Sequence, residues 1–277
     1  SQSILQVVIA RPWVKLSRYL GRPPILSYAS YCLDNWYKID NNKPVSLDNV
    51  ALINNFLGGV DEDWFVTIHV CIEDAASDAI NAGYNLSRLN KNNKVNDFSI
   101  ELKKIIKSLK KVNYIFSKMP EKCDPYIYYH RVRPYIFGTK DNPDLKNGLV
   151  YENQFDNIPQ FFRGETGAQS SIIPFLDGAL GITHTNDNLR PYLNEMRDYM
   201  PPLHRKMIEN VERESIAKTY VNKSKKLEKE YNACLEEIRR FRAKHLEYAA
   251  EYIHKQSQTQ NAFGTGGSTI RGTGGTP

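Results

Sequence analysis

The feature that most constrains the fold is a helical repeat of apolar residues along nearly the whole chain. The clearest stretch is 98–116, where apolar side chains return every four and then three residues: Phe98, Leu102, Ile105, Leu109, Val112 and Phe116. This spacing places them on one face of an amphipathic helix. A similar stripe over 223–255 predicts a helix roughly 45–50 Å long, because each helical residue adds about 1.5 Å. Since no convincing alternating strand pattern occurs, the sequence predicts an all-α fold.

Further helices are expected at 23–36, 64–80, 169–183, 187–199 and 202–219. Two segments interrupt the helical pattern: 138–168, rich in Gly, Asn, Asp and Pro, and the tail from Ser257, with its GTGGS and GTGGT repeats. Glycine-rich segments of this kind form no packed core. We therefore expect a helical domain over 1–256, followed at 257–277 by either a flexible tail or a mobile loop that closes over a ligand.

Charge and cysteine usage limit the classes of partner. Much of the net charge of +6 lies in IELKKIIKSLKK and NKSKKLEKE, where lysines occupy the outer face of expected helices. A charge run of this kind is usually a solvated helix face, and the sequence contains neither zinc-finger spacing nor an aromatic RNA-binding strand. We therefore expect no nucleic-acid partner. No apolar run reaches the roughly 18–20 residues that span a membrane. The four dispersed cysteines, without a CxxC pair, indicate reduced thiols in a cytoplasmic protein.

Two histidines on apolar helix faces are the first candidates for chemistry: His245 in FRAKHLEYAA and His69 in WFVTIHVCIEDAASDAI. A single buried histidine is usually structural and hydrogen-bonded. Two on different helices are what a helical pocket with one axial metal ligand and one distal polar group needs. HExxH is absent and the other four histidines lack tight ligand spacing, so haem fits the sequence better than zinc.

Two further segments suggest a pocket for a charged aromatic molecule. YYHRVRPYIFG (128–138) interleaves aromatic residues with Arg131 and Arg133, which form either a solvated turn or an aromatic pocket whose arginine pairs with a carboxylate. FFRGETGAQSSIIPFLDGALGI (161–182) leads from glycines and hydroxyl residues into an apolar helix. That arrangement is either a well-capped helix or a site for an anion such as a carboxylate or a haem propionate.

These segments resemble the indoleamine 2,3-dioxygenases, the haem-dependent enzymes that open the indole ring of tryptophan. The resemblance also takes in RPPILSYASYCLDNW, NPDLKNGLVYE, MRDYMPPLHR and the GTGGT loop, in this order and over nearly the whole chain. It implies an all-α haem-binding domain and haem b as cofactor. It also implies L-tryptophan or a related indole and O₂ as substrates, and an electron donor that keeps the iron ferrous. The expected product is N-formylkynurenine, the first step of the kynurenine pathway.

The resemblance also assigns roles to single residues. His245 matches the proximal iron ligand, Arg242 an arginine that pairs with a haem propionate, and Asp177 an aspartate linked to haem retention. Arg133 matches the arginine that holds the substrate carboxylate. The other substrate-pocket positions are Tyr28, Tyr31, Phe65, Tyr128, Tyr129, Ile136, Thr166 and Thr273, of which Thr166 also lies near the haem edge. Thr265, in the other glycine-threonine repeat, competes with Thr273 for its role.

Departures from the family pattern affect the expected chemistry. His69 stands where the mammalian enzymes carry serine and resembles the distal histidine of tryptophan 2,3-dioxygenases. We expect it to accept or orient the indole N–H without being an obligatory base. Tyr128 and Tyr129 replace two phenylalanines, which makes the pocket more polar and leaves a hydroxylated or substituted indole open. The alternatives are a haem enzyme of indole secondary metabolism and a non-catalytic haem sensor.

The family's small N-terminal domain and its last helix have no counterpart in the sequence, so a truncated chain is expected.

Overall fold

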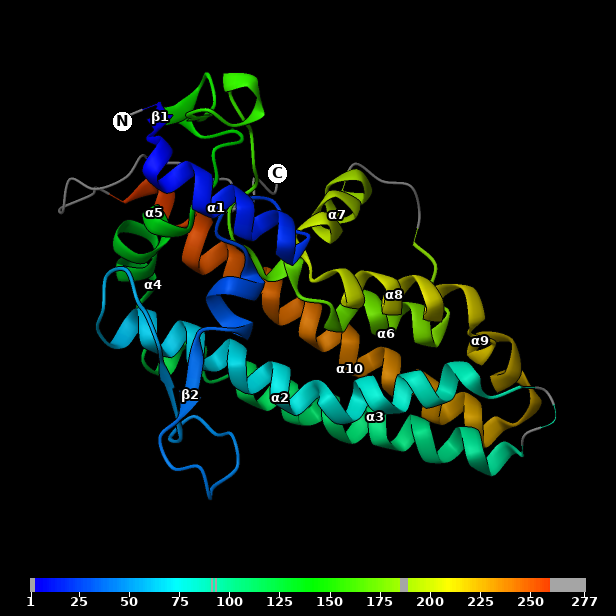
Figure 1. Ribbon diagram of the computed structural model, residues 1–277. Coiled ribbons are helices and arrows are strands. Elements are labelled where there is room, and N and C mark those ends of the chain that lie inside the picture. The colour runs from blue at the N-terminus through cyan, green and yellow to red at the C-terminus, as the bar shows by residue number, and fades with distance from the viewer. Residues whose placement is uncertain (1–2, 91, 93, 185–188, 260–277) are drawn as a thin grey trace.

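Three long helices form the base of the fold in the computed structural model, which describes residues 3–90, 92, 94–184 and 189–259. They are α2 (Val60–Arg88), α3 (Val95–Phe116) and α10 (Lys225–Ala249). Helix α3 packs against both α2 and α10 (Figure 1). The six-residue apolar stripe of 98–116 is buried along α3. The predicted all-α class and the two long amphipathic helices are therefore confirmed.

A second layer of shorter helices covers α2. Helix α6 (Ile172–Leu180) packs against both α2 and α8 (Pro202–Glu214), as Figure 1 shows. The approach of α6 to α2 is close, because a Cβ atom built on Gly83 of α2 would lie 2.8 Å from the ring of Phe175. The remaining α-helices are α1 (Val7–Leu20), α4 (Pro125–Ile127), α5 (Arg133–Ile136), α7 (Arg190–Met196) and α9 (Ala217–Tyr220).

Among the described residues, three segments have π-helical geometry: η1 (Ala29–Leu33), η3 (Tyr128–Val132) and η9 (Ala250–His254). Such turns are rare and occur frequently at functional sites. The segment η9 prolongs α10, so the predicted helix over 223–255 is continuous in its helical character to His254. The 3₁₀ turns are η2 (Met119–Glu121), η4 (Pro143–Leu145), η5 (Phe155–Asn157), η6 (Gly167–Gln169), η7 (Arg197–Tyr199), η8 (Val221–Lys223) and η10 (Gln256–Gln258).

The structure corrects the prediction for 23–36 and adds four short strands. Only Ala29–Leu33 of that segment is helical, and the chain then enters β2 (Trp36–Lys38), which pairs antiparallel with β3 (Val50–Leu52). The strand β1 (Ile4–Leu5) pairs parallel with β4 (Val150–Tyr151). The strand β4 lies inside 138–168, the region expected to be loop. Strands of two or three residues are too short to show an alternating pattern, which explains why the sequence did not indicate them.

The glycine-threonine repeats that contain Thr265 and Thr273 lie outside the described residues. None of the described helices combines the length and the apolar composition needed to cross a membrane.

Candidate active site

Five of the predicted pocket residues form one aromatic cluster. Phe65 and His69 lie one turn apart on α2, with ring centroids 4.5 Å apart. Tyr128 of η3 approaches Phe65 at 4.8 Å, and Tyr28 approaches His69 edge-on at 5.8 Å. Tyr31 of η1 lies 6.4 Å from Phe65. Three chain segments that are distant in sequence therefore meet around His69.

His69 is held as a neutral ring with a defined tautomer. Its Nδ1 lies 2.7 Å from the carbonyl oxygen of Phe65. A carbonyl can only accept, so Nδ1 carries the hydrogen and Nε2 of the neutral ring is left as an acceptor. Burial lowers the pKa of His69 to about 4, with a further lowering by the nearby His245. The ring is therefore uncharged at neutral pH and can accept a hydrogen bond through Nε2.

Glu73 is a pocket residue that the sequence analysis did not identify. It lies one helical turn after His69, and its Oε1 accepts hydrogen bonds from the Tyr28 hydroxyl at 2.9 Å and the Ser170 hydroxyl at 2.6 Å. Burial raises the pKa of its carboxyl group. Glu73 thus connects α2 to the segments that carry Tyr28 and Ser170. The four-residue spacing from His69 was the available signal, because it places both side chains on the same helix face.

Arg133 lies where η3 meets α5 and is almost fully buried, with 2% of its surface exposed. Its guanidinium stacks 4.9 Å from the ring centroid of Tyr129 and 5.1 Å from that of Phe137. Burial lowers the pKa of Arg133, opposed by the neighbouring tyrosines. Ile136, also buried, follows one turn later. Of the two interpretations of this segment, the structure therefore favours an arginine between aromatic rings and not a solvated turn.

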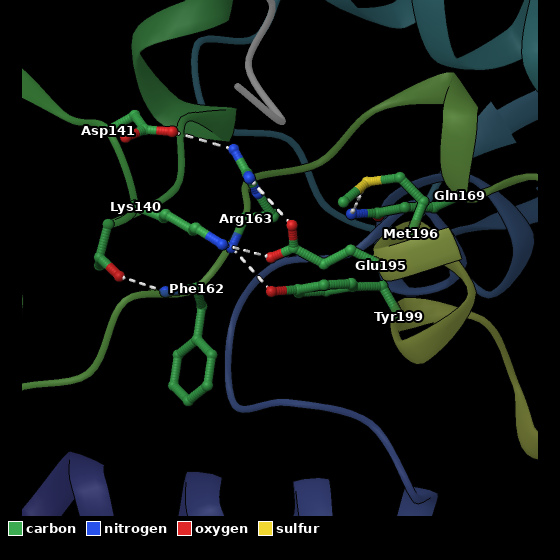
Figure 2. A network of polar contacts seen from close by, with 9 residues as sticks. Lys140, Asp141, Phe162, Arg163, Gln169, Glu195, Met196 and Tyr199 are labelled. Atoms are coloured by element: carbon green, nitrogen blue, oxygen red, sulfur yellow. Dashed lines mark hydrogen bonds and ion pairs between the residues drawn. The ribbon is translucent and has the colours of Figure 1, made fainter. Parts of the chain in front are cut away.

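The segment 162–165, which runs beside the pocket, is fastened by an ionic network (Figure 2). The Arg163 guanidinium donates to Asp141 at 3.0 Å and to Glu195 at 2.9 Å, and the Arg163 backbone N–H donates to the Tyr199 hydroxyl at 2.8 Å. Lys140 donates to the same Glu195 carboxylate at 2.7 Å. These contacts join the segment to residues 140–141 on one side and to α7 and η7 on the other.

Gln169 fastens the same segment from its other end. Its Oε1 accepts the Tyr28 backbone N–H at 2.9 Å, and its Nε2 donates to the Gly164 carbonyl at 2.9 Å. Thr166, the predicted position near substrate and haem edge, is half-buried, and its hydroxyl oxygen accepts the Ala168 backbone N–H. In this structure Thr166 therefore caps the short turn η6.

Among the other predicted haem-binding residues, Arg242 and His245 lie on α10 and Asp177 lies on α6. Arg242 donates to Oδ2 of Asp177, and Nε2 of His184 lies 2.7 Å from the same oxygen. The other oxygen of Asp177, Oδ1, is buried and has no hydrogen-bond partner among the described residues. His184 was not predicted, because its position after α6 carries no motif.

His245, three residues after Arg242 on α10, is exposed, unlike the inward-facing side chain that its apolar stripe predicted. The apolar Leu246 beside it is 69% exposed. Surrounding protein nevertheless lowers the pKa of His245 by desolvation, and the ring lies close enough to affect the pKa of His69. The ring of His245 is therefore exposed, partly desolvated by surrounding protein and near His69.

The chemistry of these residues fits a haem. A neutral imidazole is a haem-iron ligand, and Arg242 supplies a cation whose side chain is 40% exposed. Within the described part of the chain, no three His, Cys, Asp or Glu side chains gather into a metal site of their own.

Comparison with known proteins gives a match of the complete chain, residues 1–277, to the family described as indoleamine 2,3-dioxygenase. The chain belongs to the indoleamine 2,3-dioxygenase family. The predicted family and its assignment to the haem-dependent dioxygenases are thereby confirmed.

The relatives include both mammalian and fungal enzymes. Indoleamine 2,3-dioxygenase 1 of Rattus norvegicus is 35% identical over 99% of this chain and 70% of its own length. Indoleamine 2,3-dioxygenase of Saccharomyces cerevisiae is 30% identical over 91% of this chain and 60% of its own length. A protein of Fusarium equiseti named 6-hydroxytryptophan 2,3-dioxygenase is 30% identical over 98% and 71%, respectively. Similar family members therefore carry names for both plain and hydroxylated indole substrates.

Proposed function

We propose that this chain binds haem b through His245 and inserts both atoms of O₂ across the C2–C3 bond of an indole, giving N-formylkynurenine from L-tryptophan. The observation that carries the proposal is the arrangement of the two histidines. The neutral His69 lies in an aromatic cluster, near an accessible and desolvated His245 on another helix. Arg133 stacks on Tyr129 of η3, the segment that also carries Tyr128 of this cluster.

In this proposal the haem is held from α10 and α6. His245 would ligate the iron, and Arg242 would pair with a propionate while Asp177 keeps the arginine in place. When bound, the haem supplies the iron chemistry that activates O₂, with an electron donor needed to keep the iron ferrous. The chain's own residues supply position, polarity and exclusion of water.

The substrate would lie with its indole in the aromatic cluster and its amino-acid end towards Arg133. A guanidinium can bind a carboxylate through two parallel hydrogen bonds, and Thr166 lies on the neighbouring segment. The remaining indole contacts would come from Tyr28, Tyr31, Phe65, Tyr128, Tyr129 and Ile136. Thr273, proposed to cap the amino-acid end, belongs to the segment 257–277 that we propose closes over the substrate, and it lies outside the described residues.

His69 would orient the indole by accepting its N–H at Nε2. The helix carbonyl of Phe65 holds the ring in the tautomer that this contact needs. Because burial lowers the pKa of His69 to about 4, the ring keeps this role throughout the neutral range. Placing the reacting ring correctly can supply several kcal/mol of the barrier without a proton transfer.

A second candidate is an enzyme of indole secondary metabolism that acts on a substituted tryptophan, by rearrangement or monooxygenation. The polar Tyr128 and the relative named 6-hydroxytryptophan 2,3-dioxygenase favour a substituted substrate. The proposed cellular location for either enzyme is the cytoplasm. A non-catalytic haem sensor is the third possibility that the experiment below separates.

The test is a single-turnover reaction of the reconstituted, anaerobically reduced protein with L-tryptophan, followed by ¹⁸O₂. The proposal predicts a product with two labelled oxygen atoms and, after deformylation, the absorbance of kynurenine. One labelled oxygen atom would favour the monooxygenase. Unchanged tryptophan, together with a haem spectrum that responds to it, would favour the sensor.

A further inference from the structure

Glu165 is a buried carboxyl group in the pocket region for which the mechanism above has no role. It lies in FRGETGAQ between Gly164 and Thr166, and only 1% of its surface is exposed. Its backbone N–H donates to the carbonyl oxygen of Ile136 at 3.0 Å. Glu165 is therefore next in sequence to one predicted pocket residue and hydrogen-bonded to another.

The neighbours of the Glu165 side chain are those that we assign to the indole. Burial is the main cause that raises the pKa of Tyr28, Tyr31 and Tyr128 and of Cys32 on η1, and an ionised Glu165 would raise each of them further. The hydrogen bonds give the same placement, since Gln169 joins the Tyr28 backbone N–H to the carbonyl of Gly164, the residue before Glu165. The carboxyl group therefore lies among the tyrosines around the proposed indole position.

The hydroxyl groups of two of these tyrosines donate hydrogen bonds to other carboxylates. Tyr28 donates to Glu73 at 2.9 Å, and Tyr31 donates to Glu62 at 2.9 Å. Glu165 is thus a third carboxyl group near these tyrosines, in addition to Glu73 and Glu62, which accept the tyrosine hydroxyls. The indole of plain tryptophan has only its ring N–H to offer as a donor, which the proposed function directs to His69.

We infer that Glu165 is a specificity-determining residue that hydrogen-bonds a hydroxyl group on the benzo ring of a hydroxylated tryptophan. This inference rests on the proposed function and names its substrate class. A carboxyl group and a phenol are matched partners, since each can donate and each can accept. A site built to bond a substrate hydroxyl rejects the analogue that lacks it far more strongly than an apolar pocket distinguishes a single methylene.

Two further properties of Glu165 suit it to this task. Its backbone is held by its own hydrogen bond to Ile136, and the two residues before it are held by the Arg163 network of Figure 2 and by Gln169 at the Gly164 carbonyl. Burial also raises its pKa to about 8. At neutral pH it is mostly protonated and can exchange hydrogen bonds with a phenol without a buried charge.

The experiment compares kcat/KM of the haem-loaded protein for L-tryptophan, 5-hydroxy-L-tryptophan and 6-hydroxy-L-tryptophan. The variants are Glu165→Leu, which removes the hydrogen bonds at similar size, and Glu165→Gln, which keeps a donor and an acceptor. Glu209→Leu, at an exposed position on α8, is the matched control. Dissociation constants from the Soret shift of the ferric protein provide a second readout that needs no turnover.

We expect the wild type to prefer the better hydroxytryptophan over L-tryptophan. Glu165→Leu should shift that ratio towards L-tryptophan by about tenfold or more in both kcat/KM and binding, with Glu165→Gln intermediate and the control unchanged. A ratio within twofold of wild type for Glu165→Leu overturns the inference while its turnover of L-tryptophan leaves the proposed function intact. A haem-loaded wild type that oxidises none of the three substrates overturns both.

Discussion

Replacing Glu165 with glutamine should stabilise the haem-free protein by an amount that grows with pH. Burial raises the pKa of Glu165 from 4.5 to about 8. Between these values the folded protein holds a proton that the unfolded chain has released, so the free energy of unfolding of the wild type falls as pH rises. At 1.36 kcal/mol per pKa unit, the raised pKa of Glu165 lowers the free energy of unfolding by about 3 kcal/mol at pH 7. The loss approaches its limit of about 5 kcal/mol above pH 8.

Glutamine keeps the shape and hydrogen-bonding capacity of the side chain but cannot ionise. The variant therefore lacks this pH-dependent loss of unfolding free energy. Thermal denaturation of apoprotein followed by circular dichroism at pH 5, 6, 7 and 8 measures the effect. The midpoint of Glu165→Gln should exceed that of the wild type by several degrees at pH 7, with the gap closing towards pH 5. Glu209→Gln, at an exposed position, should follow the wild type. A gap that stays constant over this range would refute the argument that Glu165 is protonated in the folded protein.

Three further substitutions test other parts of the site. Gly138→Ala would place a Cβ atom 2.2 Å from the backbone nitrogen of Gly164. The free energy of unfolding, followed by thermal denaturation, should therefore fall by about 1–3 kcal/mol or more. Gly167→Ala is the control and should have little effect, because a Cβ atom there would meet nothing within 4 Å. Asp177→Asn removes the charge of an acceptor shared by an arginine and a histidine, and should speed haem transfer to apomyoglobin several-fold. His69→Ala should bind tryptophan and retain turnover at a rate about three- to tenfold lower; total loss of turnover with intact binding would instead make His69 an obligatory base.

The long helices could be predicted because their burial repeats with the helical period. Phe98 and Leu102 of α3, for example, mark the buried face directly in the sequence. The same reasoning misread 23–36, where apolar residues pack around a single π-helical turn before β2. It also predicted that His245 faces inward, whereas the structure leaves the side chain exposed, because the period of a helix does not show which segments pack over each part of its apolar face.

The polar contacts that shape the pocket were less accessible to sequence reasoning. Gln169 joins Tyr28 across 141 residues, and Ser170 joins Glu73 across 97. Such pairs have no periodic signal, since they depend on how the helices pack. Arg133 was identified from its aromatic context and the family resemblance, whereas Glu165 lay unnoticed within a quoted motif. Its burial and its neighbours, which distinguish it from an ordinary surface glutamate, exist only in the folded chain.

The central claim is that His245 holds the haem, and the absorption spectrum of the reconstituted His245→Ala variant tests it most directly. His254→Ala, at an exposed position on the helical extension η9, is the matched control. The account predicts that wild type and control bind one haem with a Soret band typical of histidine ligation. The His245→Ala variant should lose the haem, or keep it with a spectrum that free imidazole restores. A His245→Ala protein with the wild-type haem content and spectrum, or a wild type that takes up no haem on reconstitution, would contradict the account.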